Sequence, residues 1–230
     1  MKAEQTKGIV LSRTDYGEAD RIITVITPDH GKRRLMVKGV RRMKSKMAGG
    51  IELFSVSELS YIKGKGDIDT MISARLEKYY SNIVQDIERV QLGYELIKLL
   101  NRATEDNPEP EYFNLLESSF KALDQQSIDA GLIRVWFHSQ LLRLAGYTPN
   151  LQTDKDGNKL EPGIKYSFDS ESMAFLKADK GKFGKNEIQC LRVLFTDTSP
   201  KILSQIVQLA EAMPVIDTLI KQLFMLNIQR

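Results

Sequence analysis

Basic side chains are concentrated in residues 30–47, where the chain carries no carboxylate. A charge run is most often a solvated surface, but like charges held this close repel one another unless a polyanion offsets them. Arginine also suits bidentate contact with phosphate and stacking on bases. The run therefore predicts contact with a nucleic-acid backbone, largely independent of base sequence because no base-reading motif accompanies it. The candidate binding residues are Lys32, Arg33, Arg34, Lys38, Arg41, Arg42, Lys44 and Lys46.

Three aromatic side chains near this run are candidates for stacking on bases: Tyr16, Phe54 and Tyr61. Stacking on an aromatic ring tolerates any base, because every base has a π-face. Each of the three is equally expected in a hydrophobic core, and the residues alone leave both alternatives open.

Catalytic groups are scarce in this chain. Its two histidines are His30, in a turn, and His138, beside aromatic residues of a helix, and the sole cysteine is Cys190. One cysteine excludes an internal disulfide and a multi-cysteine zinc site, and no histidine lies near it in sequence to activate it. We therefore expect a binding protein rather than an enzyme, with no cofactor and no metal.

The residues that position the basic run have the pattern of a small barrel. β-Branched or alternating segments at 8–11, 21–26, 33–40, 54–62 and 68–74 are separated by turn residues, which predicts five short antiparallel strands. Closing such a sheet removes its exposed edges. The basic run would then cover one strand and the loop 40–50 that follows it.

From about residue 80 the apolar spacing changes to three and four residues, which predicts helices. Ile83, Ile87, Val90, Tyr94 and Ile97 form the expected apolar face of the first one. The fold class is therefore α+β: a five-stranded barrel followed by a mostly helical domain with a loop-rich insert. We expect four parts: a barrel (1–78), a first helical part (79–146), the insert (147–185) and a second helical part (186–230).

Charge is unevenly distributed over these parts: the net formal charge is +6 for residues 1–80, −4 for 81–150 and +1 for 151–230. The chain is 42% hydrophobic and 27% charged, as in globular proteins. Its N-terminus lacks the apolar segment of a signal peptide, and no apolar run reaches the ~18 residues of a membrane span. We expect a cytoplasmic protein without membrane contact.

Four segments resemble a known family: residues 15–23 (DYGEADRII), Thr27 with Gly31-Lys32, residues 38–42 (KGVRR) and residues 141–151 (LLRLAGYTPNL). In this order and spacing they are similar to the bacterial recombination mediator family RecO. The resemblance implies an OB-fold and a helical domain that bind single- and double-stranded DNA and anneal complementary strands near the nucleoid. It also implies DNA repair through the RecF pathway with RecR, contact with the C-terminal tail of single-stranded DNA-binding protein, and help in loading RecA.

One departure from the family concerns metal. Many members carry two CxxC pairs in the insert, and the corresponding positions here fall near Thr153, Asp156, Lys177 and Lys180. The insert therefore lacks the zinc cysteines. We expect packing of residues such as Tyr166, Phe168 and Phe175 to hold it together instead.

Two other functions remain open from the residues. The large helical portion favours a recruitment adaptor that binds protein partners, with DNA contact secondary. Under the family resemblance, a groove there would take an acidic peptide ending in an apolar residue. Arg134 and Arg143 are candidate rim residues, although both are equally expected as surface helix charges. An RNA-binding OB protein is the third possibility, because nothing in the basic run distinguishes RNA from DNA.

Overall fold

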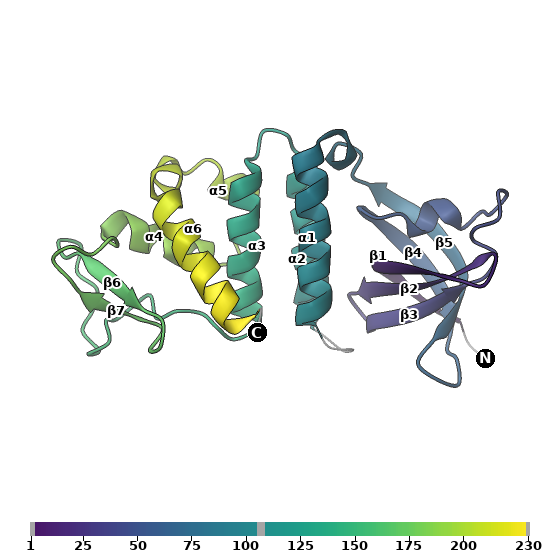
Figure 1. Cartoon of the computed structure of the whole chain (residues 1–230), viewed down its shortest axis with the longest axis horizontal. Helices are drawn as coiled ribbons and strands as arrows, with labels where there is room; N and C mark the ends of the chain where they lie inside the picture. Colours follow the sequence, from purple (N-terminus) through teal and green to yellow (C-terminus); the bar gives the residue numbers. More distant parts are fainter. Residues whose placement is uncertain (1–2, 105–108, 229–230) are drawn as a thin grey trace. The chain divides into compact units, whose positions relative to one another are not determined.

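The computed structural model of the chain describes residues 3–104 and 109–228 (Figure 1). The chain divides into two compact units, Met1–Gln126 and Ser127–Arg230. The sequence analysis grouped residues 79–146 as one helical part, whereas the structure divides that segment after Gln126. None of the described helices is both long and apolar enough to cross a membrane.

Unit 1 contains the predicted barrel, closed in the strand order β1-β2-β3-β5-β4. Neighbouring strands are antiparallel except for a short parallel contact between β3 and β5. A five-stranded barrel closed in this way is of the OB type, which confirms the expected fold class. Its strands are β1 (Ala3–Tyr16), β2 (Asp20–Thr27), β3 (Gly31–Val37), β4 (Ser55–Ile62) and β5 (Asp69–Tyr79), with a short 3-10 helix η1 (Ala48–Ile51) before β4.

Alternation along β3 explains how the basic run can lie on a barrel strand. Leu35 and Val37 are buried in the barrel core, while Arg34 on the opposite face is exposed. Residues two apart share a face of a strand, so the apolar residues of the run face inward and hold the strand in place. The strand ends at Val37, three residues earlier than the expected 33–40, because Gly39 turns the chain with φ +65°.

Phe54 joins the barrel to two helices of the same unit, α1 (Ile87–Ala103) and α2 (Pro110–Leu123). Its ring meets Tyr94 and Phe120 edge-on, with centroids 5.2 and 5.6 Å apart. Gly93 leaves room for that ring, since a Cβ there would lie 2.6 Å from Phe54 Cε1. This packing stabilises the contact of the two helices with the barrel.

The first long helix begins later than its apolar pattern indicated. Asp86 caps α1 by accepting hydrogen bonds from the backbone N–H groups of the first turn. Ile83 lies before the helix in the 3-10 turn η2 (Ile83–Gln85), and Ile87 is 73% exposed. Of the expected apolar face, Ile83 and Ile97 are buried, whereas Ile87 and Tyr94 are exposed.

Unit 2 is built on four helices: α3 (Ala130–Leu144), α4 (Lys185–Leu194), α5 (Pro200–Leu203) and α6 (Val207–Asn227). α6 packs against α3 and α4. His138 of α3 stacks on Phe224 of α6 with ring centroids 4.1 Å apart. Burial lowers the pKa of His138 to about 4, so its imidazole is neutral near pH 7.

The insert of unit 2 is a two-stranded hairpin, β6 (Tyr166–Asp169) and β7 (Ala174–Lys177), with long irregular flanks. The fully buried Phe175 lies at its centre and contacts the rings of Tyr166, Phe168 and Phe183, with centroids 6.2, 5.1 and 5.4 Å away. The expectation that aromatic packing holds the insert is confirmed for these residues.

Candidate nucleic-acid interface

The loop 38–47 leaves the barrel after β3 and is held at both ends by apolar side chains. Val40 is buried in the barrel core and Met47 packs against it. Between them the backbone N–H of Arg42 donates to the Gly39 carbonyl (3.1 Å), and that of Ser45 donates to the Arg42 carbonyl (2.9 Å). Successive turns of this kind fix the backbone and direct the remaining side chains into solvent.

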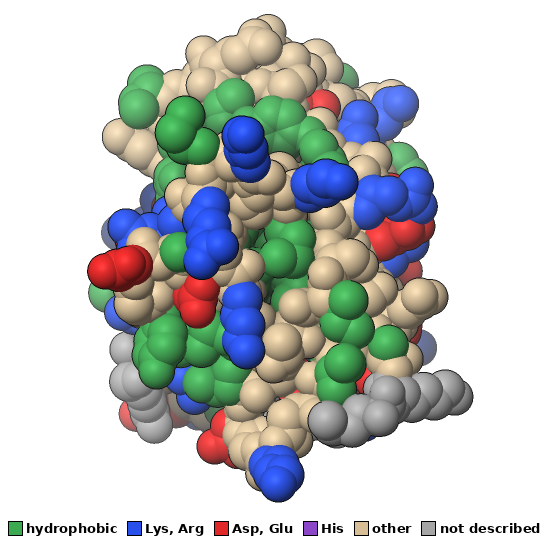
Figure 2. Space-filling view, turned by 90° about the vertical axis from the view of Figure 1, so that its right-hand side faces the viewer, with side chains coloured by type: hydrophobic (Ala, Val, Ile, Leu, Met, Phe, Trp, Pro, Cys, Tyr) green, Lys and Arg blue, Asp and Glu red, His purple; other side chains and the backbone are tan. Residues whose placement is uncertain are grey.

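The cations of this loop are all exposed: Lys38, Arg41, Arg42, Lys44 and Lys46. Within the described residues only Arg41 among them has an ion-pair partner. Figure 2, seen from the barrel side, shows several Lys and Arg side chains with exposed hydrophobic side chains between them. The loop therefore presents positive charge that the described part of the chain leaves largely uncompensated, as a phosphate backbone requires.

Arg41 connects this loop to the hairpin between β1 and β2. Its backbone N–H donates to the Ala19 carbonyl (2.9 Å), and its Nε lies 3.4 Å from Asp15 Oδ2. The Asp15 carboxylate also accepts a hydrogen bond from Arg21 Nε (2.7 Å), which, with the charge of Arg41, lowers the pKa of Asp15. The hairpin carries Tyr16, which is 55% exposed, so this candidate stacking ring is accessible beside the loop.

In the strand part of the basic run, Lys32 has partners within unit 1, and its role in DNA binding stays a prediction. Its Nζ donates to the carbonyls of Thr104 (2.7 Å) and Asn101 (2.9 Å) at the C-terminal end of α1. Those carbonyls lack helical partners, and a cation there also meets the negative end of the helix dipole. Lys32 thus links the barrel to the end of α1, whereas the loop cations extend into solvent.

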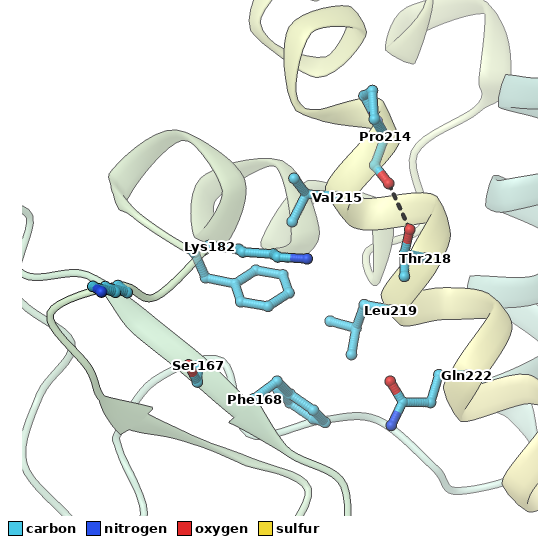
Figure 3. A pocket seen from close by; sticks show the side chains of 10 residues that line it. Ser167, Phe168, Lys182, Pro214, Val215, Thr218, Leu219 and Gln222 are labelled. Carbon is cyan, nitrogen blue, oxygen red and sulfur yellow. Dashed lines mark hydrogen bonds between the residues drawn. The ribbon is translucent and has the colours of Figure 1, made fainter.

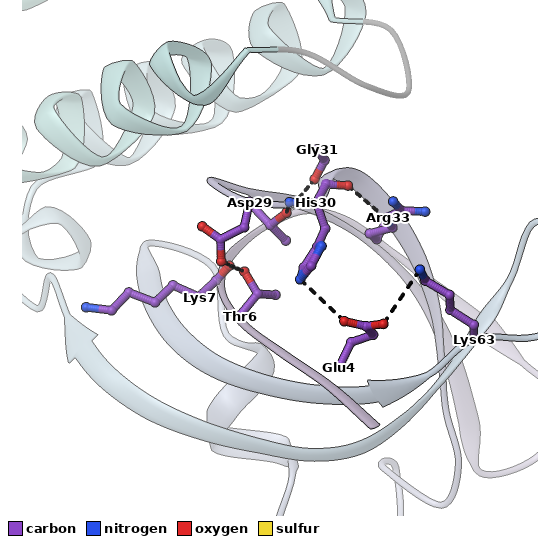
Figure 4. Close-up of polar contacts among 9 residues, drawn as sticks. Glu4, Thr6, Lys7, Asp29, His30, Gly31, Arg33 and Lys63 are labelled. Atoms are coloured by element: carbon purple, nitrogen blue, oxygen red, sulfur yellow. Dashed lines mark hydrogen bonds and ion pairs between the residues drawn. The ribbon is translucent and has the colours of Figure 1, made fainter. Parts of the chain in front are cut away.

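Arg33 lies at one end of the barrel, on the same face of β3 as the core residues (Figure 4). Its Nε donates to the His30 carbonyl (2.8 Å). Glu4 at this barrel end lies 3.9 Å from the His30 ring nitrogen and 3.6 Å from Lys63 Nζ. Arg33 therefore belongs to a mixed-charge cluster, apart from the exposed loop cations.

Two of the three candidate stacking rings are core residues. Phe54 is 3% exposed and Tyr61 is fully buried, so neither offers a ring face to a base. Burial also raises the pKa of Tyr61. Both are therefore core residues, which was the alternative to base stacking. Of the three candidate rings, Tyr16 alone is exposed enough to stack on a base.

Met43 is a surface residue that the sequence analysis did not single out. Its side chain is fully exposed at the centre of loop 38–47. Its position in the sequence, as an apolar residue directly between Arg42 and Lys44, could have indicated it as a candidate contact residue.

The candidate rim residues Arg134 and Arg143 are half-buried on α3. Arg143 Nε donates to the Gln140 side-chain oxygen (3.0 Å). A cavity of about 490 Å³ lies elsewhere in this unit, between the insert and α6 (Figure 3). Neither arginine is among its lining residues, which are Ser167, Phe168, Lys180, Lys182, Phe183, Pro214, Val215, Thr218, Leu219 and Gln222.

The zinc-cysteine positions of the insert carry other interactions. Thr153 pairs with Lys159 across a turn built on the buried Asp154, whose carboxylate accepts hydrogen bonds from the backbone N–H groups of Asp156 and Asn158. Lys177 Nζ lies 3.3 Å from Glu161. Among the described residues no group of three or more His, Cys, Asp and Glu side chains is placed to hold a metal ion.

Fold and surface together define an α+β protein whose N-terminal OB-type barrel presents a cationic loop. Comparison with family models adds the family: "Recombination protein O N terminal" matches residues 1–80 and "Recombination protein O C terminal" matches residues 84–203. The second match alone covers more than half of the chain, and the chain belongs to the RecO family.

Curated relatives agree with this assignment. The chain is 34% identical over 149 residues to the "DNA repair protein RecO" of a Dehalococcoides mccartyi strain, covering 64% of this chain and 58% of the relative. A Trichodesmium erythraeum protein of the same name is 30% identical over 194 residues, covering 78% and 67%. The match to the Dehalococcoides protein thus spans less than two thirds of that relative's length.

Proposed function

We propose that the chain acts in DNA repair, as its relatives' name indicates, and in homologous recombination, by binding single- and double-stranded DNA through loop 38–47. The observation that carries the proposal is the set of exposed cations in a loop without any carboxylate. Each phosphate contact releases condensed counterions, so such a loop favours any DNA backbone regardless of sequence.

The proposed mechanism needs no covalent step, so we expect binding rather than catalysis. Two complementary strands repel each other through their phosphates until base pairs form. Cations that contact both backbones offset that repulsion, while base pairing supplies the specificity. This geometry supports strand annealing. From the family resemblance we further propose action with RecR in the RecF pathway, loading RecA onto coated single strands at the nucleoid.

The experiment is salt-dependent binding and annealing by the purified chain with Arg41, Arg42, Lys44 and Lys46 replaced by Ala. For single strands, the logarithm of the binding constant K should fall by about 0.7 per contacted phosphate for each tenfold rise in salt. Losing four contacts should therefore make the slope of log K against log salt shallower by about 3. Affinity at low salt should drop on the order of a hundredfold, equally for unrelated sequences. Annealing should weaken in parallel.

A matched control carries the same change of charge in unit 2. Ala replaces four exposed lysines there: Lys159, Lys165, Lys185 and Lys201. This control should retain DNA affinity within a fewfold of the original chain. Unchanged affinity in the loop variant, or equal losses in both variants, contradicts the proposal. Competition between DNA and RNA oligomers of one sequence tests the RNA-binding alternative.

The cavity between the insert and α6 favours a second function, recruitment through a protein partner. Its walls are apolar at Phe168, Val215 and Leu219, and Lys180 and Lys182 contribute the positive charge (Figure 3). An acidic peptide that ends in an apolar residue matches this combination, because the apolar side chain is buried while the carboxylates meet the lysines. We propose the C-terminal tail of single-stranded DNA-binding protein as that peptide.

A labelled acidic tail peptide, titrated with and without DNA, tests recruitment. Lys180→Glu with Lys182→Glu should abolish peptide binding and leave DNA binding by loop 38–47 unchanged. The control is the same reversal at Lys159 and Lys201, which do not line the cavity. Failure of the unmodified chain to bind the peptide removes this function without affecting the DNA proposal.

A further inference from the structure

Met43 is the most exposed large hydrophobic side chain of the described residues. Its relative exposure is 104%, compared with 73% for Ile87, which ranks next. Leaving such a side chain in water forgoes the free energy that its burial contributes. Single exposed apolar residues are common on protein surfaces, so what distinguishes Met43 is its position among exposed cations.

The backbone around Met43 holds the side chain outward. The Arg42 N–H donates to the Gly39 carbonyl and closes the turn before it, the Ser45 N–H donates to the Arg42 carbonyl and closes the turn that contains it, and Val40 anchors the loop in the core. These turns fix the loop backbone, and the Met43 side chain extends from it into solvent.

The neighbours of Met43 are cations. Arg41 and Arg42 precede it, Lys44 and Lys46 follow it, and all four are exposed. A strand whose phosphates meet cations on both sides of Met43 brings its sugars and bases over the one apolar group between them. Thioethers make favourable contacts with aromatic rings, and proteins that distort DNA insert apolar side chains, Met among them, at base steps.

We propose that Met43 packs against a nucleobase of the strand bound by loop 38–47, an inference that rests on the DNA contact proposed above. The contact uses the face or edge of the ring without hydrogen bonds, so it does not discriminate among bases. Met43 thereby lets the loop distinguish DNA with bases from a bare sugar-phosphate polyanion. Tyr16 lies exposed on the hairpin that Arg41 contacts, and it provides an aromatic ring at the same end of the barrel.

The test uses two ligands with equal numbers of phosphates: an oligothymidylate and an abasic oligomer of the same length. Met43→Gln keeps the side-chain length and charge but makes the tip polar, whereas Met43→Leu keeps it apolar. Met43→Gln should bind oligothymidylate about fivefold to tenfold more weakly, and Met43→Leu should bind it like the original chain. Both should bind the abasic oligomer normally and keep the slope of log K against log salt, because no charge changes.

Two results overturn the inference. If Met43→Gln binds oligothymidylate as tightly as the original chain, Met43 makes no base contact, and a role in protein binding becomes the better explanation of its exposure. If the variant loses affinity equally for both oligomers, the effect comes from the loop and not from bases. An original chain that binds neither oligomer overturns the DNA proposal and this inference together, whereas the first two results leave the DNA proposal intact.

Discussion

Two irregular, cation-rich segments of the chain use their charges in opposite ways. Loop 38–47 carries five exposed cations and no carboxylate, and most of these charges have no ion-pair partner in the described part of the chain. Residues 150–184 carry six lysines and six carboxylates. There Lys155 pairs with Asp169 at 2.8 Å, and Lys177 pairs with Glu161.

The difference shows that a count of cations does not by itself indicate a polyanion site. In the insert, lysines form ion pairs with nearby carboxylates beside a hairpin whose centre is aromatic. In the loop no carboxylate competes within the segment, so its charge is available to an external ligand. The two segments should therefore respond to mutation in opposite ways, one in stability and the other in DNA affinity.

The largest effect is expected for Phe175→Ala in the insert. Removing this fully buried ring leaves a cavity among its aromatic neighbours and should destabilise the insert by about 3 to 5 kcal/mol. Hydrogen exchange of residues 150–184 measures the loss. DNA affinity should stay the same, and a large fall in it would show that the insert takes part in DNA binding.

Acid should destabilise unit 2 through His138, whose pKa falls from its ordinary 6.5 to about 4 on folding. Between these values the unfolded chain binds more protons than the folded one, so stability is full above pH 6.5 and declines as the pH drops toward 4. The loss should approach about 3 kcal/mol, since each pKa unit corresponds to about 1.36 kcal/mol.

Unfolding of the original chain and of His138→Phe over this pH range measures the effect. The phenylalanine keeps the stacking on Phe224 but cannot titrate. Its stability should therefore lack this pH-dependent component. An equal acid sensitivity in both chains would place the cause elsewhere.

Lys32→Met separates the strand part of the basic run from the loop part. The substitution removes the bonds to the end of α1 and should destabilise unit 1 by about 2 kcal/mol, as for hydrogen bonds to charged groups. Thermal unfolding measures this loss. Arg34→Met, on the exposed face of the same strand, is the control and should unfold like the original chain. A loss of DNA affinity with unchanged stability in Lys32→Met would reverse the assignment.

The smallest effect tests the role of carboxylates directly. Asp15→Asn removes the only carboxylate of the described residues that pairs with a loop cation, so DNA affinity should rise about twofold to fivefold at low salt and converge with the original at high salt. Fluorescence titration at two salt concentrations measures it. Glu161→Asn, which frees Lys177 in the insert, should have no effect on DNA affinity. If both substitutions raise affinity equally, the loop is not a distinct site.

The sequence by itself determined the fold class and the place of the charge. Apolar alternation and turn residues specified the barrel strands, because a strand that buries one face needs a period of two. The aromatic residues of the insert were also identifiable, since with one cysteine in the chain packing was the remaining way to hold it. These features depend on local pattern and on composition.

Only the tertiary structure decided which candidate residues are available. Lys32 and Arg33 belong to the same basic run as Lys44, yet Lys32 donates to the Thr104 carbonyl far along the chain, whereas Arg33 donates to the His30 carbonyl in the adjacent turn. Phe54 and Tyr61 were equally consistent with surface and core, because burial depends on what packs against a ring. The division after Gln126 likewise depends on contacts between distant segments, such as those of Phe54 with Tyr94 and Phe120 within unit 1, which no local pattern of charge or hydrophobicity encodes.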